Sequence, residues 1–437
     1  MRFTPLANRL ALTLSLSVTA ALTACGGGGD DGSNTQMRLL NATRSFATLD
    51  LTADDKAVSS KVAYANVGEY GSVGTSAASI KVLDSVSGVS LQALTPQLNA
   101  NSRYTLVLSG FAGAVRPSLI EENQDAAEAN RAKLQVLNLA PDAGALDVYV
   151  TAAANCTLSN EAALVTNLAG STGSIYNVIN SGKFRVCVTG YSKRNDLRLE
   201  IPEVTLDSTT VNTLILTATD GGVLVNGMTL LHKSTVKNFP TTLTRVRAVS
   251  ALAGTAPVSA TISGNNILPS SLPPNTTDYY SFTAGANSVA ITANSIPVGP
   301  ATYNFLAGNE YTLLVWGDET TQQVSVLVDD NRLPTISGNV KMRLVNGMSA
   351  ANALASLNVD YQTQASNVLP GTSSVPANMN SSTGAAVTVN SPLKVDAIYN
   401  PASGTSTGLT PLTANGVYTV FVMGDPNNVK GKLSKDR

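Results

Sequence analysis

Residues 404 to 408 read Gly-Thr-Ser-Thr-Gly, a Gly-x-Ser-x-Gly spacing that can present a serine nucleophile on a tight strand-to-helix turn. Such a serine needs a histidine base beside it. The chain has a single histidine, His232, in a different part of the sequence, and no helical pattern follows Gly408. We therefore interpret this stretch as a loop and expect no catalytic residue. We expect His232, at the end of a strand, to face solvent.

Several aspartates could supply the oxygen ligands that calcium prefers. Two pairs are adjacent in sequence, and neighbouring side chains on a strand point to opposite faces of the sheet. No stretch has the alternating oxygen spacing of a calcium loop, so we expect solvated turn acids, no metal and no cofactor. We expect Asp142 to hydrogen-bond its own backbone in a turn. The aspartates considered are Asp54, Asp55, Asp142, Asp318, Asp329, Asp330 and Asp425.

The first residues have the order typical of a secretory signal, with Arg2 and Arg9 near the start and an apolar run from Leu10 to Ala21. The run is shorter than the roughly 20 apolar residues of a membrane-spanning helix. The sequence Leu-Thr-Ala-Cys then ends at Cys25 and resembles the bacterial lipobox. This resemblance implies that residues 1–24 are removed and that Cys25 is acylated. A plain signal peptide with an incidental cysteine is the alternative.

Residues 25–36 are rich in glycine and polar residues, a composition that serves as a flexible tether. Several acyl chains on one residue give stable anchoring to a lipid bilayer. Residue 27 is Gly rather than Asp, which by resemblance to the sorting rule of diderm bacteria favours the outer membrane. We expect a lipid-anchored protein of the bacterial cell envelope.

Besides Cys25, the chain contains only Cys156 and Cys187. In an exported protein two such cysteines are expected to form a disulfide. Free thiols are the alternative. Closing this loop would contribute about 3–4 kcal/mol in the chain-entropy model.

Composition favours an all-β protein without a nucleic-acid partner. Charged residues make up 13% of the chain and the formal net charge is −1, so no basic face for nucleic acid is indicated. The sequence is rich in Thr, Ser, Asn, Ala, Val and Gly, which suit strands and turns.

Four stretches share one pattern: a strand, a turn of small residues, another strand, and a late strand that closes before a glycine. Their anchor residues lie roughly 100 residues apart, which is the size of a domain rather than of a solenoid turn. The anchors are Asn41, Asn138, Ser250 and Asn346, and the closings contain Tyr104-Thr105, Asn212-Thr213, Tyr311-Thr312 and Tyr418-Thr419. We place the repeats at residues 37–131, 132–240, 241–336 and 337–437.

Apolar residues alternate within each repeat, as in Leu146, Val148 and Val150, which is typical of half-buried strands. The predicted fold is therefore all-β: four tandem Ig-like antiparallel β-sandwich modules after a lipoprotein signal and a flexible tether. The acidic, Ala-rich stretch Ser118–Lys133 is interpreted as a linker or a brief helix.

The second repeat, with "VLNLAPDAGALDVYV", "SGKFRVCVTG" and "NTLILTATDG", resembles the bacterial DUF4397 domain. The first and fourth repeats keep Asn41, Asn346 and the Tyr-Thr closings but lack Pro-Asp, and the third also lacks the Asn. The resemblance implies a secreted or anchored, repeated β-sandwich-like module and no established activity. It is best at Asn138, Pro141, Asp142, Asp147, Val148, Tyr149 and Val150.

Aromatic residues gather in the third repeat, and such residues can form platforms for sugars or partner proteins. They are Tyr279, Tyr280, Tyr303, Tyr311 and Trp316. Because both faces of "YTLLVWGD" are apolar, we expect Trp316 in the core. The sequence thus predicts a non-enzymatic envelope protein with a binding, adhesion or spacer role, whose ligand is an envelope protein or a glycan. The alternative is an enzyme or accessory subunit acting on envelope polysaccharide.

Overall fold

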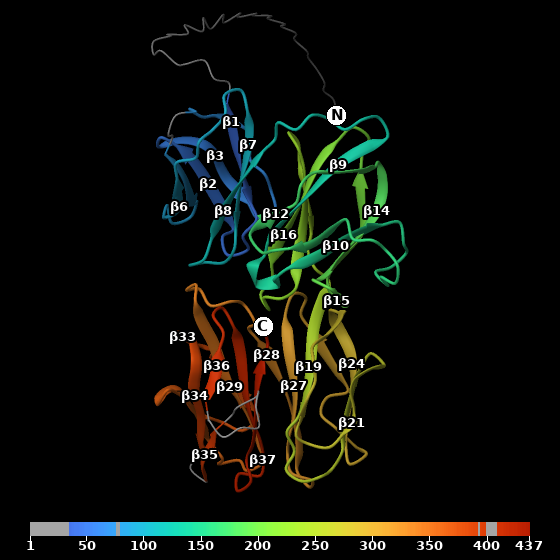
Figure 1. Cartoon of the computed structure of the whole chain (residues 1–437), viewed down its shortest axis with the longest axis vertical. Coiled ribbons are helices and arrows are strands. Elements are labelled where there is room, and N and C mark those ends of the chain that lie inside the picture. Colours follow the sequence, from blue (N-terminus) through green and yellow to red (C-terminus); the bar gives the residue numbers. More distant parts are fainter. Residues whose placement is uncertain (1–34, 76–78, 392–393, 399–408) are drawn as a thin grey trace, which may run out of the picture. The chain divides into compact units, whose positions relative to one another are not determined.

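The computed structural model describes residues 35–75, 79–391, 394–398 and 409–437. These residues form strands and one short 3-10 helix, η1 (Pro141–Ala143), arranged as several pairs of sheets that are each packed as a sandwich (Figure 1). The described part contains no helix long and apolar enough to cross a membrane.

The first sandwich comprises strands β1 (Gln36–Asn41), β2 (Thr48–Ala53), β3 (Lys56–Ala63), β4 (Gly71–Ser72), β5 (Ile80–Asp84), β6 (Ser90–Leu94), β7 (Arg103–Ser109) and β8 (Arg116–Glu121). Its sheets have the orders β4-β1-β7-β8 and β3-β2-β5-β6. They enclose a core that includes Leu39, Leu51 and Leu106.

The second sandwich comprises strands β9 (Arg131–Leu139), β10 (Leu146–Thr151), β11 (Val165–Leu168), β12 (Thr172–Gly173), β13 (Asn177–Asn180), β14 (Gly182–Gly190), β15 (Lys193–Leu206), β16 (Val211–Ala218), β17 (Val225–Leu231) and β18 (Val236–Phe239). The sheet β12-β9-β16-β17-β18, with β13 also paired to β9, packs on β11-β10-β14-β15.

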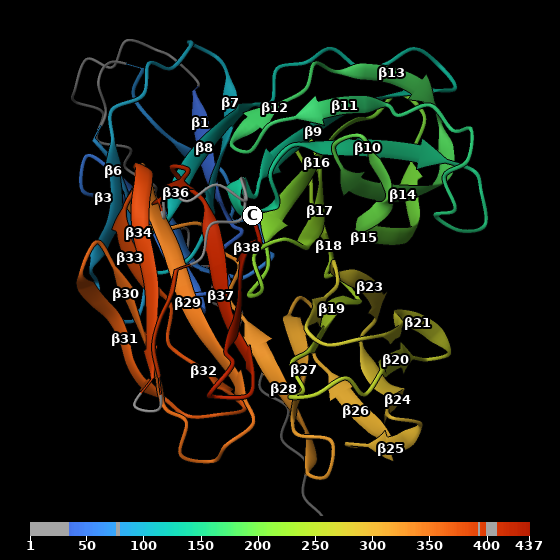
Figure 2. The ribbon, with the colours of Figure 1, turned by 60° about the horizontal axis from the view of Figure 1, so that its bottom comes forward.

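The third sandwich comprises strands β19 (Leu243–Ser250), β20 (Val258–Ile262), β21 (Asn265–Ser271), β22 (Asn275–Thr276), β23 (Tyr280–Thr283), β24 (Gly285–Ala293), β25 (Ile296–Val298), β26 (Thr302–Phe305), β27 (Glu310–Gly317) and β28 (Gln322–Asp329). Its main sheets are β22-β19-β27-β28 and β21-β20-β24-β25 (Figure 2).

The fourth sandwich comprises strands β29 (Asn339–Met348), β30 (Ala355–Val359), β31 (Gln362–Val368), β32 (Thr372–Ser373), β33 (Ala377–Asn380), β34 (Ser382–Ser391), β35 (Lys394–Ile398), β36 (Leu409–Leu412), β37 (Val417–Gly424) and β38 (Lys430–Lys435). Its main sheets are β32-β29-β37-β38 and β31-β30-β34-β35.

One sheet of every sandwich is mixed, which corrects the expectation of purely antiparallel modules. The opening strand runs parallel to the late closing strand, as in the pairs β1 with β7, β9 with β16, β19 with β27 and β29 with β37. A parallel pair needs a long crossover, and here the strands between its members, including those of the opposite sheet, provide it.

The late strands are buried on both faces, as both apolar faces of β27 indicated, whereas the expectation of half-buried strands is wrong for β7, β16 and β37. In β2, partly buried and buried residues alternate, whereas every residue of β37 is buried. The second face is covered by a neighbouring sandwich. Leu40 and Val107 of the first sandwich pack with Ile215 and Met228 of the second. A similar cluster joins the third and fourth sandwiches through Val249, Leu314, Val345, Phe421 and Met423.

The asparagine anchors of the repeats hold each opening strand to the hairpin that follows it. Asn138 donates from Nδ2 to the carbonyls of Gly144 (2.9 Å) and Leu168 (3.0 Å), and its Oδ1 accepts from the Ala140 N–H (3.1 Å). Asn41 and Asn346 make the corresponding three bonds. Ser250, at this place in the third sandwich, has a buried hydroxyl without a hydrogen-bond partner among the described residues.

The stretch Ser118–Lys133 contains no helix. Its beginning belongs to β8 and its end to β9, and residues 122–130 form an irregular linker. Of the two interpretations from sequence, the linker is correct.

Candidate functional site

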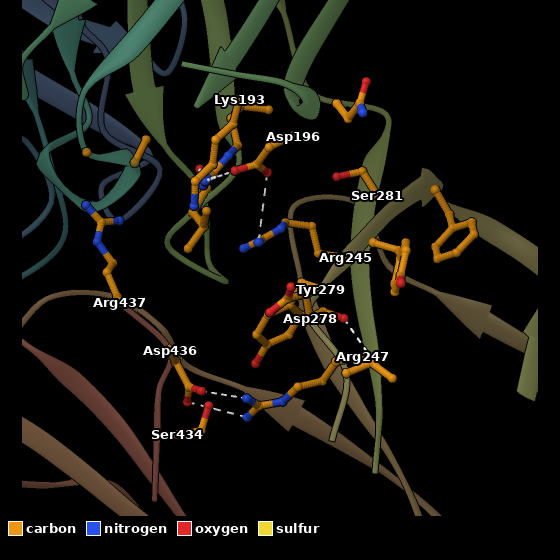
Figure 3. A pocket seen from close by; sticks show the side chains of 18 of the residues that line it. Lys193, Asp196, Arg245, Arg247, Asp278, Tyr279, Ser281, Ser434, Asp436 and Arg437 are labelled. Carbon is orange, nitrogen blue, oxygen red and sulfur yellow. Dashed lines mark hydrogen bonds and ion pairs between the residues drawn. The ribbon is translucent and has the colours of Figure 1, made fainter. Parts of the chain in front are cut away.

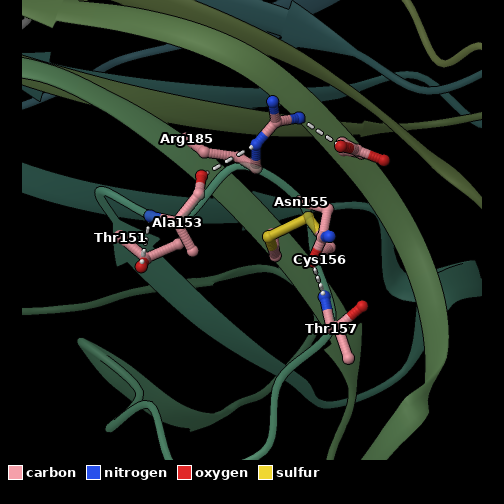
Figure 4. The surroundings of a disulfide bond; sticks show 8 residues. Thr151, Ala153, Asn155, Cys156, Thr157 and Arg185 are labelled. Atoms are coloured by element: carbon pink, nitrogen blue, oxygen red, sulfur yellow. Dashed lines mark hydrogen bonds and ion pairs between the residues drawn. A yellow bond between two sulfur atoms is a disulfide. The ribbon is translucent and has the colours of Figure 1, made fainter.

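Cys156 and Cys187 form the expected disulfide, with their Cα atoms 5.7 Å apart (Figure 4). Cys187 lies in β14, and the bond ties the loop after β10 to this strand. The two cysteines pack with Tyr149 and Leu158. Cys25 and the Gly404–Gly408 stretch lie outside the described residues.

The expectation that His232 faces solvent is wrong. Its ring is partly buried, and Nε2 lies 3.0 Å from Thr213 Oγ1 and 3.3 Å from the Tyr176 hydroxyl. Burial lowers the pKa of His232, although the nearby Glu122 carboxylate of the first sandwich acts in the opposite direction.

His232 occupies one of three polar positions that recur in each sandwich. In the first, Arg38 on β1 donates from Nε to Thr105 Oγ1 on β7 (2.8 Å), and its Nη2 lies 3.0 Å from Glu122 after β8. The register repeats these positions in the other sandwiches, because a residue of the opening strand lies opposite the Thr of the closing strand. In the second sandwich, however, Gln135 donates to the Ser174 carbonyl (3.0 Å). The three positions hold Arg38, Thr105 and Glu122, then Gln135, Thr213 and His232, then Arg247, Thr312 and Asp329, and finally Arg343, Thr419 and Asp436.

Two of these networks exchange partners between the third and fourth sandwiches. Arg247 Nη1 lies 2.5 Å from Asp436 Oδ1, and Arg343 Nη2 lies 2.7 Å from Asp329 Oδ1. Burial alone would raise the pKa of Asp329, but Arg343 and Arg247 outweigh it and hold the pKa below its usual range. Asp329 is therefore a buried ion-pair partner, and the expectation that it is a solvated turn acid is wrong.

The other aspartates divide between exposed turns and structural contacts. Asp318 and Asp425 accept hydrogen bonds from backbone N–H groups of their own exposed turns, as predicted. Asp142 instead accepts a hydrogen bond from the distant Leu333 N–H (2.6 Å), which corrects the expectation of a purely local bond. Asp330 pairs with Arg332 and Lys341. Among the described residues, no group of His, Cys, Asp or Glu side chains could hold a metal ion.

The aromatic residues of the third sandwich do not form one platform. Tyr311 is in the core with Tyr303 against it, whereas the Tyr279 hydroxyl donates to Asp329 Oδ2 (2.6 Å). Trp316 lies partly buried between the third and fourth sandwiches rather than inside one core, and a Cβ added at Gly371 would lie 2.4 Å from its ring. Tyr280 is 43% exposed.

A cavity of about 980 Å³ lies where segments of the second, third and fourth sandwiches meet (Figure 3). Residues 192–196 and Arg198, around the start of β15, contribute from the second sandwich. Arg245, Arg247 and residues 277–282 contribute from the third, and residues 434–437 from the end of the fourth. These segments are far apart in the sequence, so no local motif could have indicated this site.

The cavity lining carries an excess of positive charge, although the whole chain has a formal net charge of −1. Its cations are Lys193, Arg194, Arg198, Arg245, Arg247, Lys435 and Arg437, and its acids are Asp196, Asp278 and Asp436. Arg198 pairs with Asp196, and Arg245 Nη1 lies 3.0 Å from Glu310 Oε1. Lys193 and Lys435 are exposed and make no ion pair with a described residue.

Burial and, to a lesser extent, neighbouring like charges lower the pKa of two guanidinium groups of the lining. Burial, followed by the nearby Arg245, lowers the pKa of Arg198. Burial lowers the pKa of Arg437 to about 10, and Arg198 and Arg245 add to this effect while Asp142 opposes it. The pKa of Arg245 is raised instead, because Glu310 and Asp196 outweigh its burial.

Comparisons with known proteins gave one family and a few remote structural similarities. No curated protein matches the chain. CBMbc (family CBM26) from Eubacterium rectale Amy13K, solved in complex with maltoheptaose, is 15% identical with a TM-score of 0.17, over 46% of this chain and 96% of that one. A candidate cell adhesion protein from Bacteroides uniformis is 12% identical with a TM-score of 0.21, over 46% and 97% of the two chains. The Bacillus anthracis TIE protein is 8% identical with a TM-score of 0.15, over 86% and 66%.

Residues 35–149 and 244–357 match the model of a domain of unknown function, DUF4397. Each matched stretch spans one sandwich and continues into the opening strands of the next. The motif that carried the resemblance, from Asn138 onward, therefore lies at the end of the first stretch, and the third repeat, which resembled the family least, lies within the second. Because the two stretches cover more than half of its residues, the chain belongs to the DUF4397 family.

Proposed function

We propose that this chain is a non-enzymatic binding protein of the bacterial cell envelope and that its ligand occupies the cavity between the second, third and fourth sandwiches. The observation that carries the proposal is the cavity itself, about 980 Å³ with charged and aromatic side chains in its wall. Its volume is at the upper end of the roughly 300–1,000 Å³ typical of ligand pockets. Polar side chains together with an exposed ring such as Tyr280 suit a sugar chain.

The proposed architecture is four tandem Ig-like modules, one for each repeat at residues 37–131, 132–240, 241–336 and 337–437. A tyrosine at the start of the closing strand supports it. The hydroxyls of Tyr104, Tyr311 and Tyr418 accept hydrogen bonds from backbone N–H groups five residues upstream, at 2.8, 3.1 and 2.9 Å. A comparable tyrosine corner is a feature of immunoglobulin sandwiches.

The proposed location is a membrane surface of the cell envelope, the outer membrane in a diderm organism. Acylated Cys25 would anchor the chain, and residues 25–36 would separate the sandwiches from the bilayer. The disulfide between Cys156 and Cys187 is consistent with an oxidising compartment.

Binding to arrays of glycans and envelope proteins tests the function. The probe is a soluble chain of residues 34–437, which form one compact unit. We expect saturable binding that Tyr280→Ala weakens and that Tyr361→Ala, at a 94% exposed tyrosine outside the cavity, leaves unchanged. If no ligand on the arrays binds, the proposed binding role is wrong. If the protein releases soluble product from a polysaccharide, the proposed non-enzymatic role is wrong.

A further inference from the structure

The charge of the cavity indicates which class of ligand it takes. Seven Lys or Arg side chains and three Asp side chains line it, so four positive charges are unmatched within the lining. Glu310 compensates part of this excess through Arg245, and Asp329 compensates another part through Arg247. The exposed ammonium groups of Lys193 and Lys435 are left without an acidic partner among the described residues.

Hydrogen-bond donors are unmatched as well. Arg198 and Arg245 are 9% and 7% exposed, and the Nε atom of each lacks an acceptor among the described residues. Arg437 Nη2 donates to the Pro141 carbonyl (2.7 Å), but its Nη1 is buried without an acceptor. These three atoms are themselves closed to solvent, so the guanidinium groups act on a cavity ligand through their positive charge rather than through hydrogen bonds from these atoms.

We propose that the cavity binds an acidic oligosaccharide, whose oxyanion groups pair with Lys193 and Lys435 and are held in place by the guanidinium groups of Arg198, Arg245 and Arg437. This inference rests on the proposed binding function and specifies its ligand. Guanidinium groups match carboxylate and phosphate oxygens in geometry, and ammonium groups add point charges. Tyr280 at the same wall presents an exposed ring to a sugar face.

The test measures binding of oligogalacturonate to residues 34–437 by calorimetry at low salt. The matched ligand control is the methyl ester of the same oligomer, which has the same rings without the charges. We expect the free acid to bind at least about tenfold more tightly than the ester and its affinity to fall as salt is added. Equal affinities would overturn the anionic class while leaving the binding function in place.

A charge-reversed variant locates the site. Lys193→Glu with Lys435→Glu is expected to reduce the affinity for oligogalacturonate by about tenfold or more. The matched control is Lys56→Glu with Lys432→Glu, at exposed lysines outside the cavity, and it is expected to change the affinity less than about twofold. Equal losses of affinity in both double variants would overturn the proposed site, because the affinity would then depend only on the net charge of the protein. Thermal midpoints that match the wild type show that both variants are folded.

A third experiment distinguishes the contribution of the sugar rings to binding from that of the negative charges. Inorganic phosphate is added at a concentration of charges equal to that of the oligomer. We expect it to displace oligogalacturonate weakly, because it lacks the rings that contact Tyr280. If phosphate displaces the oligomer completely at this concentration, the site takes a free oxyanion and the saccharide part of the proposal is wrong.

Discussion

At the scale of single residues, the buried asparagine of the repeat offers a direct test of stability. Asn138→Ala removes three hydrogen bonds to the backbone and leaves the carbonyls of Gly144 and Leu168 and the N–H of Ala140 without these partners. We expect a loss of about 2–4 kcal/mol in the free energy of unfolding, measured in urea. Ser250→Ala is the matched control, because the hydroxyl that it removes has no partner, and it should change stability by less than about 0.5 kcal/mol. Equal effects would contradict this role of Asn138.

His232 predicts a pH dependence. Because burial lowers its pKa in the folded state, the unfolded chain binds a proton more readily, and stability that is fully present above the unfolded pKa of 6.5 is lost as the pH falls below it. The charged groups that face the ring are Glu122, Arg38 and Lys233. We expect the thermal midpoint of the wild type to fall more between pH 7.5 and pH 5.5 than that of His232→Gln. Since the chain has no other histidine, parallel pH profiles would show that His232 does not titrate in this way.

Several of these residues could be singled out from the sequence, but their structural roles could not. The repeated Asn and the Tyr-Thr pairs are apparent in the sequence. The hydrogen-bond partners of Thr105, Thr312 and Thr419, however, follow from the register of a parallel strand pair, and the alternation of apolar residues does not reveal that register. His232 and Asp329 were expected in solvent because the sequence gives no sign that a second sandwich covers the end of a strand. Burial between sandwiches depends on long-range packing, and local patterns do not encode it.

At the scale of elements, two exchanged ion pairs hold the third and fourth sandwiches together: one joins β19 to the residue after β38, and the other joins β29 to β28. Arg247 and Asp436 are both almost fully buried, so removing one partner leaves an uncompensated charge. Asp436→Asn should cost about 3 kcal/mol or more, and Arg247→Met with Asp436→Asn should cost less than the sum of the single variants. Chemical denaturation of the four proteins measures this coupling. The control cycle uses the exposed pair Lys183 and Glu203, whose coupling should stay below about 1 kcal/mol.

The strand content, the repeat and the disulfide could be predicted from the sequence. Each depends on the local spacing of residues or on the number of residues of one type. The parallel pairs and the two-sided burial of β7, β16 and β37 could not, since an apolar run is compatible with several neighbours. The cavity could not be predicted from the sequence either. Its wall joins the start of β15, the segment around β23 and the residues after β38, and only the packing of three sandwiches brings their cations together.

At the scale of the whole molecule, the proposed lipid anchor limits binding to ligands that lie near a membrane surface. A single cysteine, Cys25, precedes the glycine-rich residues, and acyl chains at that position would confine the sandwiches to within a tether's length of a bilayer. We expect Cys25→Ser to move the protein from the membrane fraction to the soluble fraction of the cell or to leave it with its signal uncleaved, as fractionation and the mass of the isolated chain would show. Asn34→Ser, a change beyond the cysteine, should leave the protein in the membrane fraction. Persistence of the Cys25→Ser protein at the membrane, with residues 1–24 removed, would mean that the sandwiches themselves hold the surface and that the cavity is not displayed by a lipid anchor.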